Sequence, residues 1–258
     1  MILEVKDLAY KYPKVKEETI KDINFSLQKG QIMCILGPNG SGKTTLLNCL
    51  ANLITPSKGM IKVAGKSIRS IGRREAAKEI GYVPQFHNAV YAYTVREFVT
   101  MGRTPYLDIL GTPKKKDIEI ADEAVSKMKI EHLAHKKYTN LSGGEKQQAM
   151  IARILVQNPK IIMLDEPTNH LDYGNQIRTL KMIKELSQQG YTIIMTTHNP
   201  DHALMLEDKA AIVDYGSRFI YGDSKDILTQ DNLSKIYGLN LEMIYIKERD
   251  KKICITSI

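Results

Sequence analysis

The sequence has no apolar run long enough to cross a membrane. Its longer uninterrupted apolar stretches, such as residues 32–36 and 161–164, fall far short of the roughly 20 residues that a membrane-spanning helix requires. A secretory signal would need a positive start and a longer apolar run, whereas the first residues include a carboxylate at Glu4. We therefore expect no membrane span and a chain that stays in the cytosol.

Cysteine is scarce, and its placement suits neither a metal site nor a disulfide framework. The three cysteines, Cys34, Cys49 and Cys254, are an odd number and have no metal-ligand spacing. Each lies among apolar neighbours, as a small buried residue would. This pattern predicts reduced thiols with a structural role.

Aromatic residues interleaved with arginines, which are typical of a single-strand nucleic-acid surface, are also missing. The net charge of +8 and the pI near 9.2 would suit a nucleic-acid binder, a neighbour of an anionic membrane or a lysine-rich surface. The densest lysine cluster, residues 114–116, follows Pro113 and is predicted to be a solvated loop. We therefore expect no nucleic-acid partner.

The chain does contain the pattern of an α/β fold. Its 258 residues, with 43% hydrophobic and 26% charged residues, suit a single folded unit. Apolar runs of strand length alternate with helix-length periodic segments, which predicts a parallel sheet covered by helices. The expected strands are residues 32–36, 160–164 and 192–196, and the expected helices are residues 43–53 and 173–189.

Two regions depart from this alternation. Strand signals fade between Phe86 and Gln157, where residues 95–101 and 117–128 have helical periodicity, so we expect a helical lobe inserted into the core. Near the end of the chain, residues 243–247 and 252–258 partly alternate apolar with polar residues around a polar turn. This tail is predicted to form a short β-hairpin.

The strongest chemical signal is a phosphate-binding loop at residues 37–44, Gly-Pro-Asn-Gly-Ser-Gly-Lys-Thr, between a predicted strand and a predicted helix. Its glycines allow successive N–H groups to point inward, and the helix adds the positive end of its dipole. We expect Lys43 to reach the β and γ phosphates and the Thr44 hydroxyl to ligate Mg²⁺. A glycine turn that merely caps a helix would be the structural alternative.

A pair of acids follows the strand at residues 161–164. In α/β sheets the carboxyl edge of the strands is where ligands bind. Asp165 is suited to hold Mg²⁺, and Glu166 is suited to polarise the attacking water as general base. Taken alone, such a pair would be a helix cap or a solvated turn, but a phosphate loop in the same chain favours the catalytic interpretation.

The segment Leu-Ser-Gly-Gly-Glu at residues 141–145 precedes a helical stretch at residues 146–157. Ser142 and Glu145 fit a capping box, which would simply start that helix. Two glycines exceed this need, and they would expose backbone donors to an anion, which makes a second phosphate-binding surface. One phosphate would then lie between two subunits.

The phosphate loop, the Leu-Ser-Gly-Gly-Glu segment and the strand-end Asp-Glu pair, in that order, resemble the ABC transporter ATPases over nearly the whole chain. The resemblance implies one ABC ATPase domain over residues 1–258. It would have a P-loop NTPase core with a mixed or parallel sheet (about 1–87 and 158–240), an antiparallel β subdomain, a helical subdomain (about 88–157) and the hairpin (about 243–258). It also implies ATP and Mg²⁺, a head-to-tail homodimer, and transmembrane permease subunits at the cytoplasmic face of the membrane.

The resemblance also implies roles for residues that match the family's motifs. Gln85 matches the glutamine loop, which senses Mg²⁺ and joins the lobes, and His198 matches the histidine that contacts the γ-phosphate. Asp172 matches the loop that touches the opposite subunit. Tyr12 matches the aromatic that stacks on adenine, with Tyr10 as the alternative. The expected catalytic residues are Lys43, Gln85, Glu166 and His198; the expected nucleotide-binding residues are Tyr12, Gly37, Asn39, Gly40, Ser41, Gly42, Lys43, Thr44, Thr45, Ser142, Gly143, Gly144 and Asp172; the expected metal ligands are Thr44, Gln85 and Asp165.

The cargo is suggested by two further segments. Residues 94–106, which include Gly-Arg-Thr-Pro, and residues 227–238 resemble the importers of ferric siderophores, haem and cobalamin, where the first segment lies near the permease contact. Import would also involve a substrate-binding protein, indirectly. A generic amphipathic helix and a capped terminal helix would explain the same residues without any cargo.

The sequence does not favour the other functions that share some of these features. An ABC ATPase acting on nucleic acid or ribosomes usually has two modules or long coiled coils, but this sequence has one phosphate loop and no sustained heptads. A kinase or a GTPase would not explain residues 141–145, and the guanine motif Asn-Lys-x-Asp is missing. A zinc site at His198 and His202 lacks the acidic partner of the usual motif.

Overall fold

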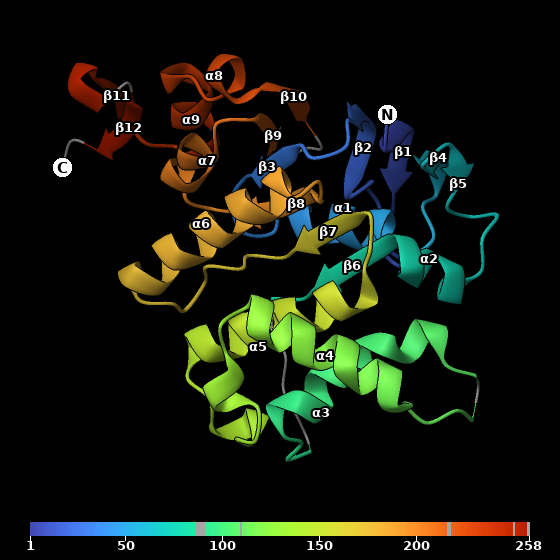
Figure 1. Ribbon diagram of the computed structural model, residues 1–258. Helices are drawn as coiled ribbons and strands as arrows, with labels where there is room; N and C mark the ends of the chain where they lie inside the picture. Colours follow the sequence, from blue (N-terminus) through green and yellow to red (C-terminus); the bar gives the residue numbers. More distant parts are fainter. Residues whose placement is uncertain (86–90, 109, 216–217, 250, 257–258) are drawn as a thin grey trace.

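The computed structural model describes residues 1–85, 91–108, 110–215, 218–249 and 251–256 (Figure 1). A core of sheets and helices forms one lobe, and α3, α4 and α5 form a second lobe below it in this view. The predicted α/β core with a helical insertion is therefore confirmed. The predicted boundary between the two at residues 87 and 88 lies outside the described residues.

A six-stranded sheet forms the centre of the core, with strand order β10-β9-β3-β8-β7-β6. Its neighbours pair in parallel except β10, which runs antiparallel to β9. The strands are β3 (Ile32–Leu36), β6 (Ile80–Val83), β7 (Ile161–Leu164), β8 (Thr192–Thr197), β9 (Lys209–Val213) and β10 (Phe219–Asp223). Because β3, β6, β7 and β8 are parallel, the loops that follow them meet at one edge of the sheet.

Both faces of this sheet are covered, as parallel sheets require. Along β3, Met33 and Ile35 belong to one apolar cluster, whereas Ile32, Cys34 and Leu36 belong to the other. This alternation follows from the two-residue period of a strand. The apolar run of β3 is therefore continuous because each of its faces packs against a different core.

The first core lies between the central sheet and an antiparallel sheet of order β2-β1-β4-β5. Its helix α1 (Lys43–Leu50) contributes Leu46, Leu47, Cys49 and Leu50 to this cluster. The antiparallel strands are β1 (Leu3–Tyr10), β2 (Ile20–Leu27), β4 (Lys58–Val63) and β5 (Lys66–Ser67). The expected antiparallel β subdomain is thus present, and it covers the face of the sheet on which α1 lies.

The second core joins the other face of the sheet to helices of both lobes. The helices and 3-10 turns of the chain, apart from α1, are α2 (Arg73–Glu79), α3 (Val95–Thr100), η1 (Met101–Tyr106), α4 (Lys115–Lys127), η2 (Glu131–Leu133), η3 (Tyr138–Asn140), α5 (Gly143–Gln157), α6 (Tyr173–Gln188), α7 (Pro200–Leu206), α8 (Ser224–Ile227), α9 (Gln230–Tyr237) and η4 (Lys247–Arg249). Since α5 packs against α3, α4 and β6, it connects the helical lobe with the central sheet.

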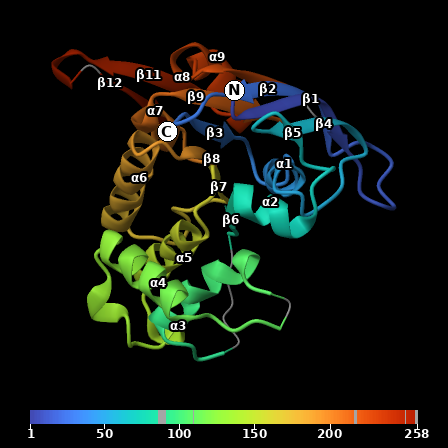
Figure 2. The same cartoon turned by 45° about the vertical axis from the view of Figure 1, so that its right-hand side comes forward.

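The C-terminal tail forms a two-stranded antiparallel sheet of β11 (Leu241–Ile246) and β12 (Lys251–Thr256). In Figure 2 it extends from the core on the side opposite the helical lobe. The backbone N–H of Cys254 donates to Asp201 Oδ1 over 3.0 Å, which attaches β12 to α7. The hairpin prediction is confirmed, although residues 257 and 258 of its expected second strand lie outside the described residues.

Some local predictions were wrong. The helix expected over residues 43–53 ends at Leu50, because Asn52 has φ 57° and the Leu53 N–H turns back to the carbonyl of Asn48. Lys115 and Lys116 are exposed but begin α4 rather than lie in a loop.

The cysteines lie largely in the interior. Cys34 and Cys49 are buried, and burial raises the pKa of the Cys49 thiol to about 12, whereas Cys254 is only half-buried. Among the described residues, no helix has the length and apolar character of a membrane span.

Candidate active site

A cleft of about 690 Å³ opens at the edge of the sheet where β3, β6, β7 and β8 end. The phosphate loop follows β3, Gln85 follows β6, Glu166 follows β7 and His198 follows β8, so four separate segments meet there. The cleft is lined by Tyr12, Thr19, Asn39, Gly40, Gly42, Lys43, Thr44, Thr45, Gln85, Glu166, Asn169 and His198.

The phosphate loop needs glycine for two different reasons. Gly40 and Gly42 have φ of 82° and 102°, which residues with a side chain rarely adopt. At Gly37, a Cβ atom would lie 2.1 Å from the carbonyl oxygen of Val213 and 2.7 Å from Ser41 Oγ. The loop therefore packs closely against β9 and leads into the N-terminus of α1, which is a suitable place for an anion.

Two polar side chains of the loop are buried. Lys43 Nζ donates to the carbonyl oxygens of Gly37 and Pro38, at 2.8 and 2.9 Å. Burial lowers the pKa of the Lys43 ammonium, and the nearby Glu166 carboxylate opposes that shift. Ser41 Oγ is buried without a hydrogen-bond partner among the described residues. A phosphate would supply acceptors for these donors, so the loop fits an anionic ligand.

The Glu166 carboxylate is contacted by four side chains. Oε1 lies 3.6 Å from Lys43 Nζ, and Oε2 lies 3.4 Å from Nδ1 of His198. Oε2 also accepts hydrogen bonds from Gln85 Nε2 at 3.1 Å and from Asn169 Nδ2 at 3.0 Å. The Glu166 backbone has φ 46°, and strained backbone of this kind is common at functional sites. The other three predicted catalytic residues, Lys43, Gln85 and His198, therefore converge on the Glu166 carboxylate.

Asp165 lies beneath this group and is 2% exposed. Its Oδ1 accepts from the Thr196 hydroxyl at 2.6 Å, and its Oδ2 accepts from the Tyr82 hydroxyl at 3.3 Å. Thr196 Oγ1 also accepts from the N–H of Glu166 at 2.8 Å, so one hydroxyl orients both acids. Burial, followed by the charge of Asp165, raises the pKa of Tyr82, which keeps this phenol protonated as a donor.

The loop that carries His198 is held by α9 and by the buried His202 side chain. Tyr237 of α9 donates its hydroxyl to the carbonyl oxygen of His198 over 2.8 Å. His202 is buried within 3.3 Å of the hydroxyls of Thr168 and Thr197, and burial lowers its pKa. Since His202 Nδ1 faces these hydroxyls, it serves the packing of the loop, and a zinc role is not needed to explain it.

Tyr12 lines the mouth of the cleft, and its hydroxyl lies 3.1 Å from Thr45 Oγ1. Tyr10 is the last residue of β1 and packs edge-to-face against Tyr12, with 4.8 Å between the ring centroids. Since Tyr12 borders the cleft and Tyr10 packs against the first core, the geometry favours Tyr12 for stacking on a base.

The Ser142 turn, residues 141–145, lies apart from this cleft. Ser142 caps α5 in a complete capping box with Glu145, and Ser142 and Gly143 are exposed. Asp172 is also exposed and caps α6, where the Asn175 N–H lowers its pKa first. A Cβ atom on Gly144 would lie 2.8 Å from the Asn175 side chain, so the turn packs against the start of α6. The structure therefore does not bring Ser142, Gly143, Gly144 or Asp172 to the phosphate loop of the same chain.

A model of the ABC transporter family matches residues 20–169, which is more than half of the chain. The chain belongs to the ABC transporter ATP-binding family. Two relatives of this ABC ATPase are MolC, a molybdate import ATP-binding protein of Haemophilus influenzae, and a probable iron chelatin transport ATP-binding protein of Helicobacter pylori. MolC is 35% identical over 92% of this chain and 88% of its own, and the second is 35% identical over 100% of both chains.

A solved structure supports the same assignment. It comes from an inward-facing ABC transporter assigned to the metal-chelate type, which is 33% identical to this ABC ATPase and covers 100% of this chain and 98% of its own, with a TM-score of 0.89. The predicted fold and the predicted ATPase activity are thereby confirmed.

The predicted metal ligands of this ABC ATPase have the chemistry that suits Mg²⁺. Thr44, Gln85 and Asp165 offer the hard oxygen ligands that Mg²⁺ prefers. The described residues contain no group of three or more His, Cys, Asp or Glu that could hold a metal ion. This agrees with the usual way in which Mg²⁺ is bound, through one or two protein ligands plus substrate phosphates.

Sequence reasoning missed four residues of the site of this ABC ATPase. Asn169 contacts Glu166, Thr196 orients both acids, Tyr82 contacts Asp165, and Tyr215 donates to the carbonyl oxygen of Asn39 at 2.8 Å. Asn169, three residues after Glu166, and Thr196, two before His198, had a usable signal in their spacing. Tyr82 and Tyr215 had none, because strand pairing and a long-range contact bring them to the site.

Proposed function

We propose that this chain is the ATP-hydrolysing subunit of an importer, and that it works as a head-to-tail homodimer on the cytoplasmic face of the membrane beneath permease subunits. The convergence of Lys43, Gln85 and His198 on the Glu166 carboxylate is the observation that supports the proposal most strongly. A carboxylate held in this way can accept a proton from a water molecule placed between it and a bound phosphate.

The proposed hydrolysis uses the residues at the strand ends. Glu166 takes a proton from water, the water oxygen attacks the γ-phosphorus, and the bond to the bridging oxygen of ADP breaks, which yields ADP and phosphate. Lys43 turns from its loop carbonyls toward the phosphates, and His198 orients the water. Thr44, Gln85 and Asp165 would hold Mg²⁺, which offsets the charge of the phosphates.

The exposed Ser142 turn supports the dimer. Its glycines and the N-terminus of α5 offer donors that no group of the phosphate-loop cleft uses. A second copy in head-to-tail orientation would place this turn on the nucleotide held by Lys43, and Asp172 beside the same interface. Two nucleotides would then be enclosed, and hydrolysis would open the dimer and move the permease.

We further propose that the cargo is a metal chelate such as a ferric siderophore, haem or cobalamin. The iron chelatin relative and the transporter of metal-chelate type support this class. MolC, at comparable identity, favours molybdate as the second candidate. Cargo does not touch an ATPase subunit, so the permease-facing surface carries only indirect information.

Reconstitution in liposomes with the cognate permease and binding protein tests the proposal. We expect a several-fold rise in ATP hydrolysis when the binding protein carries one of the three chelates, and no rise with molybdate. A rise with molybdate alone would assign the second candidate. Ribosome- or DNA-stimulated hydrolysis without any response to the permease would refute a transport function.

A further inference from the structure

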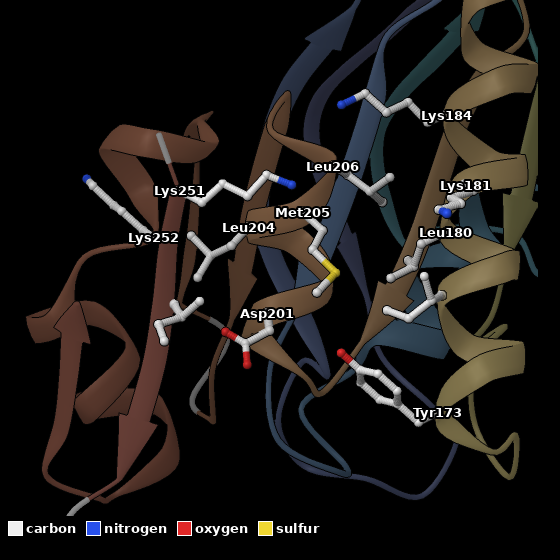
Figure 3. A pocket seen from close by; sticks show the side chains of 12 residues that line it. Tyr173, Leu180, Lys181, Lys184, Asp201, Leu204, Met205, Leu206, Lys251 and Lys252 are labelled. Atoms are coloured by element: carbon white, nitrogen blue, oxygen red, sulfur yellow. The ribbon is translucent and has the colours of Figure 1, made fainter. Parts of the chain in front are cut away.

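A second cavity of about 430 Å³ lies between α6, α7 and β12 (Figure 3). None of its lining residues borders the phosphate-loop cleft. Its volume falls within the roughly 300–1,000 Å³ typical of small-molecule sites. One wall belongs to the core and the other to the C-terminal hairpin, so the cavity exists only because the tail packs against α7.

The interior of this cavity is apolar. Side chains from all three elements form it, and they are Ile177, Leu180, Leu204, Met205, Leu206 and Ile253. Apolar surface of this kind favours a hydrocarbon group over water, at about 25 cal/mol for each Å² that is covered. The cavity therefore suits the apolar part of a ligand.

Lysines lie at its mouth. Lys181 and Lys184 come from α6 and Lys251 comes from β12, and in Figure 3 the amino groups of Lys184 and Lys251 extend from opposite walls toward the space between them. Lys252 also lines the cavity, but its amino group points away. Within the described part of the chain, none of these lysines takes part in an ion pair.

One acid is also present at the wall. Asp201 lines the cavity, and its Oδ1 accepts the N–H of Cys254 at 3.0 Å. This carboxylate thus fixes β12 to α7. One negative charge does not balance the positive charges of Lys181, Lys184 and Lys251. An anion between the two walls would reduce the repulsion among these cations.

We propose that this cavity binds an amphipathic anion, with its hydrocarbon part on the apolar interior and its anionic head between Lys184 and Lys251. The combination of a half-open cavity with an apolar interior and unpaired cations on facing walls carries the proposal. A neutral hydrocarbon would leave the cations unpaired, and a small inorganic anion would leave the interior empty.

Decanoate, kept below its micelle concentration, is the probe, and binding to the full chain is measured by isothermal titration calorimetry. We expect one saturable site per chain, with decanol and acetate each binding at least tenfold more weakly. Lys184→Glu/Lys251→Glu is expected to weaken decanoate binding at least tenfold. Leu204→Trp, which fills the interior, is expected to abolish it while ATP binding stays unchanged.

Lys115→Glu/Lys116→Glu is the matched control, since it makes the same change of charge at exposed positions far from the cavity. We expect it to bind decanoate within twofold of the parent. Decanoate binding that survives both Lys184→Glu/Lys251→Glu and Leu204→Trp, or equal binding of decanol, would overturn the proposal. The proposal would also be overturned if the parent chain did not bind decanoate and Lys184→Glu/Lys251→Glu lost self-association. The lysines would then face a second copy of the chain.

Discussion

The phosphate-loop cleft and the Ser142 turn both present a helix N-terminus, but they differ in how complete they are. In the cleft, the polar groups of four segments contact one another around Glu166. At the turn, the side chains of Ser142 and Glu145 each accept a hydrogen bond from the other residue's backbone N–H, and Gly143 is exposed. The first region is organised within one chain, whereas the second would be one wall of a site only in the proposed dimer.

This difference teaches where each half of the chemistry resides. Proton transfer and metal binding need groups fixed to within fractions of an ångström, and the parallel sheet supplies that precision at its edge. A surface that closes on a partner's nucleotide must instead remain accessible in the single chain.

Glu166→Gln is expected to produce the largest effect. The amide keeps the shape of the side chain but cannot accept the proton, so ATP turnover should fall by roughly 10²- to 10⁴-fold. ATP binding should persist, because the phosphate loop and Lys43 remain. Turnover and nucleotide affinity are measured separately, with the exposed Glu123→Gln as control. Hydrolysis at the parent rate would remove Glu166 from the role of general base.

Ser142→Arg is expected to lower turnover by about 100-fold or more while a single chain still binds ATP within about threefold of the parent affinity. The reason is that a long side chain on the exposed turn would keep a second copy away, whereas the cleft of the same chain is untouched. Sedimentation of the ATP-loaded protein should show a loss of dimer.

Thr139→Arg is the control for adding an arginine to the surface, since Thr139 is exposed shortly before the turn. Its turnover should stay within about twofold of the parent. If Ser142→Arg also hydrolyses ATP normally, the two regions do not form a shared site.

The smallest effect concerns the free energy of unfolding and the buried His202 beneath the His198 loop. Burial and the neighbouring His198 hold the pKa of His202 below its ordinary value of 6.5, while Asp201 acts in the opposite direction. The unfolded chain therefore takes up this proton at a higher pH than the folded chain. The contribution of His202 to the free energy of unfolding is fully present above pH 6.5. It should fall as the pH drops below this value, by at most about 1.4 kcal/mol per pH unit.

Urea unfolding between pH 7.5 and 5.5 measures this contribution. His202→Gln should show a shallower loss of stability with falling pH than the parent, whereas the exposed His132→Gln should keep the parent's slope. If the free energy of unfolding fell with pH equally steeply in the parent and in His202→Gln, His202 would not be the group that destabilises the folded chain in acid.

The elements that position the site could largely be predicted, because β3, β7, β8 and α6 carry strong local patterns. The phosphate loop and the Asp165–Glu166 pair follow strands that are buried on both faces, and their apolar runs are visible without any partner. The antiparallel strands could not be placed in the same way, since their register depends on pairing between β1, β2 and β4.

Contacts between distant residues were likewise beyond local patterns. Nothing near Arg103 indicates that its guanidinium pairs with Asp117 at 2.8 Å and also donates to the carbonyl oxygen of Val156. The Gly-Arg-Thr-Pro segment is thus tied into the helical lobe by Arg103, whichever surface it also presents. At Gly102, a Cβ atom would lie 2.1 Å from the carbonyl oxygen of Arg153, so this glycine is needed for the close approach to α5.

The Tyr237 hydroxyl reaches the carbonyl oxygen of His198, and this bond has a practical consequence for anyone who handles the protein. The loop that carries the histidine is secured at its back by α9, the last helix before the hairpin. A truncation that removes Tyr237 would therefore remove a support of this loop, even though the two lie far apart along the chain.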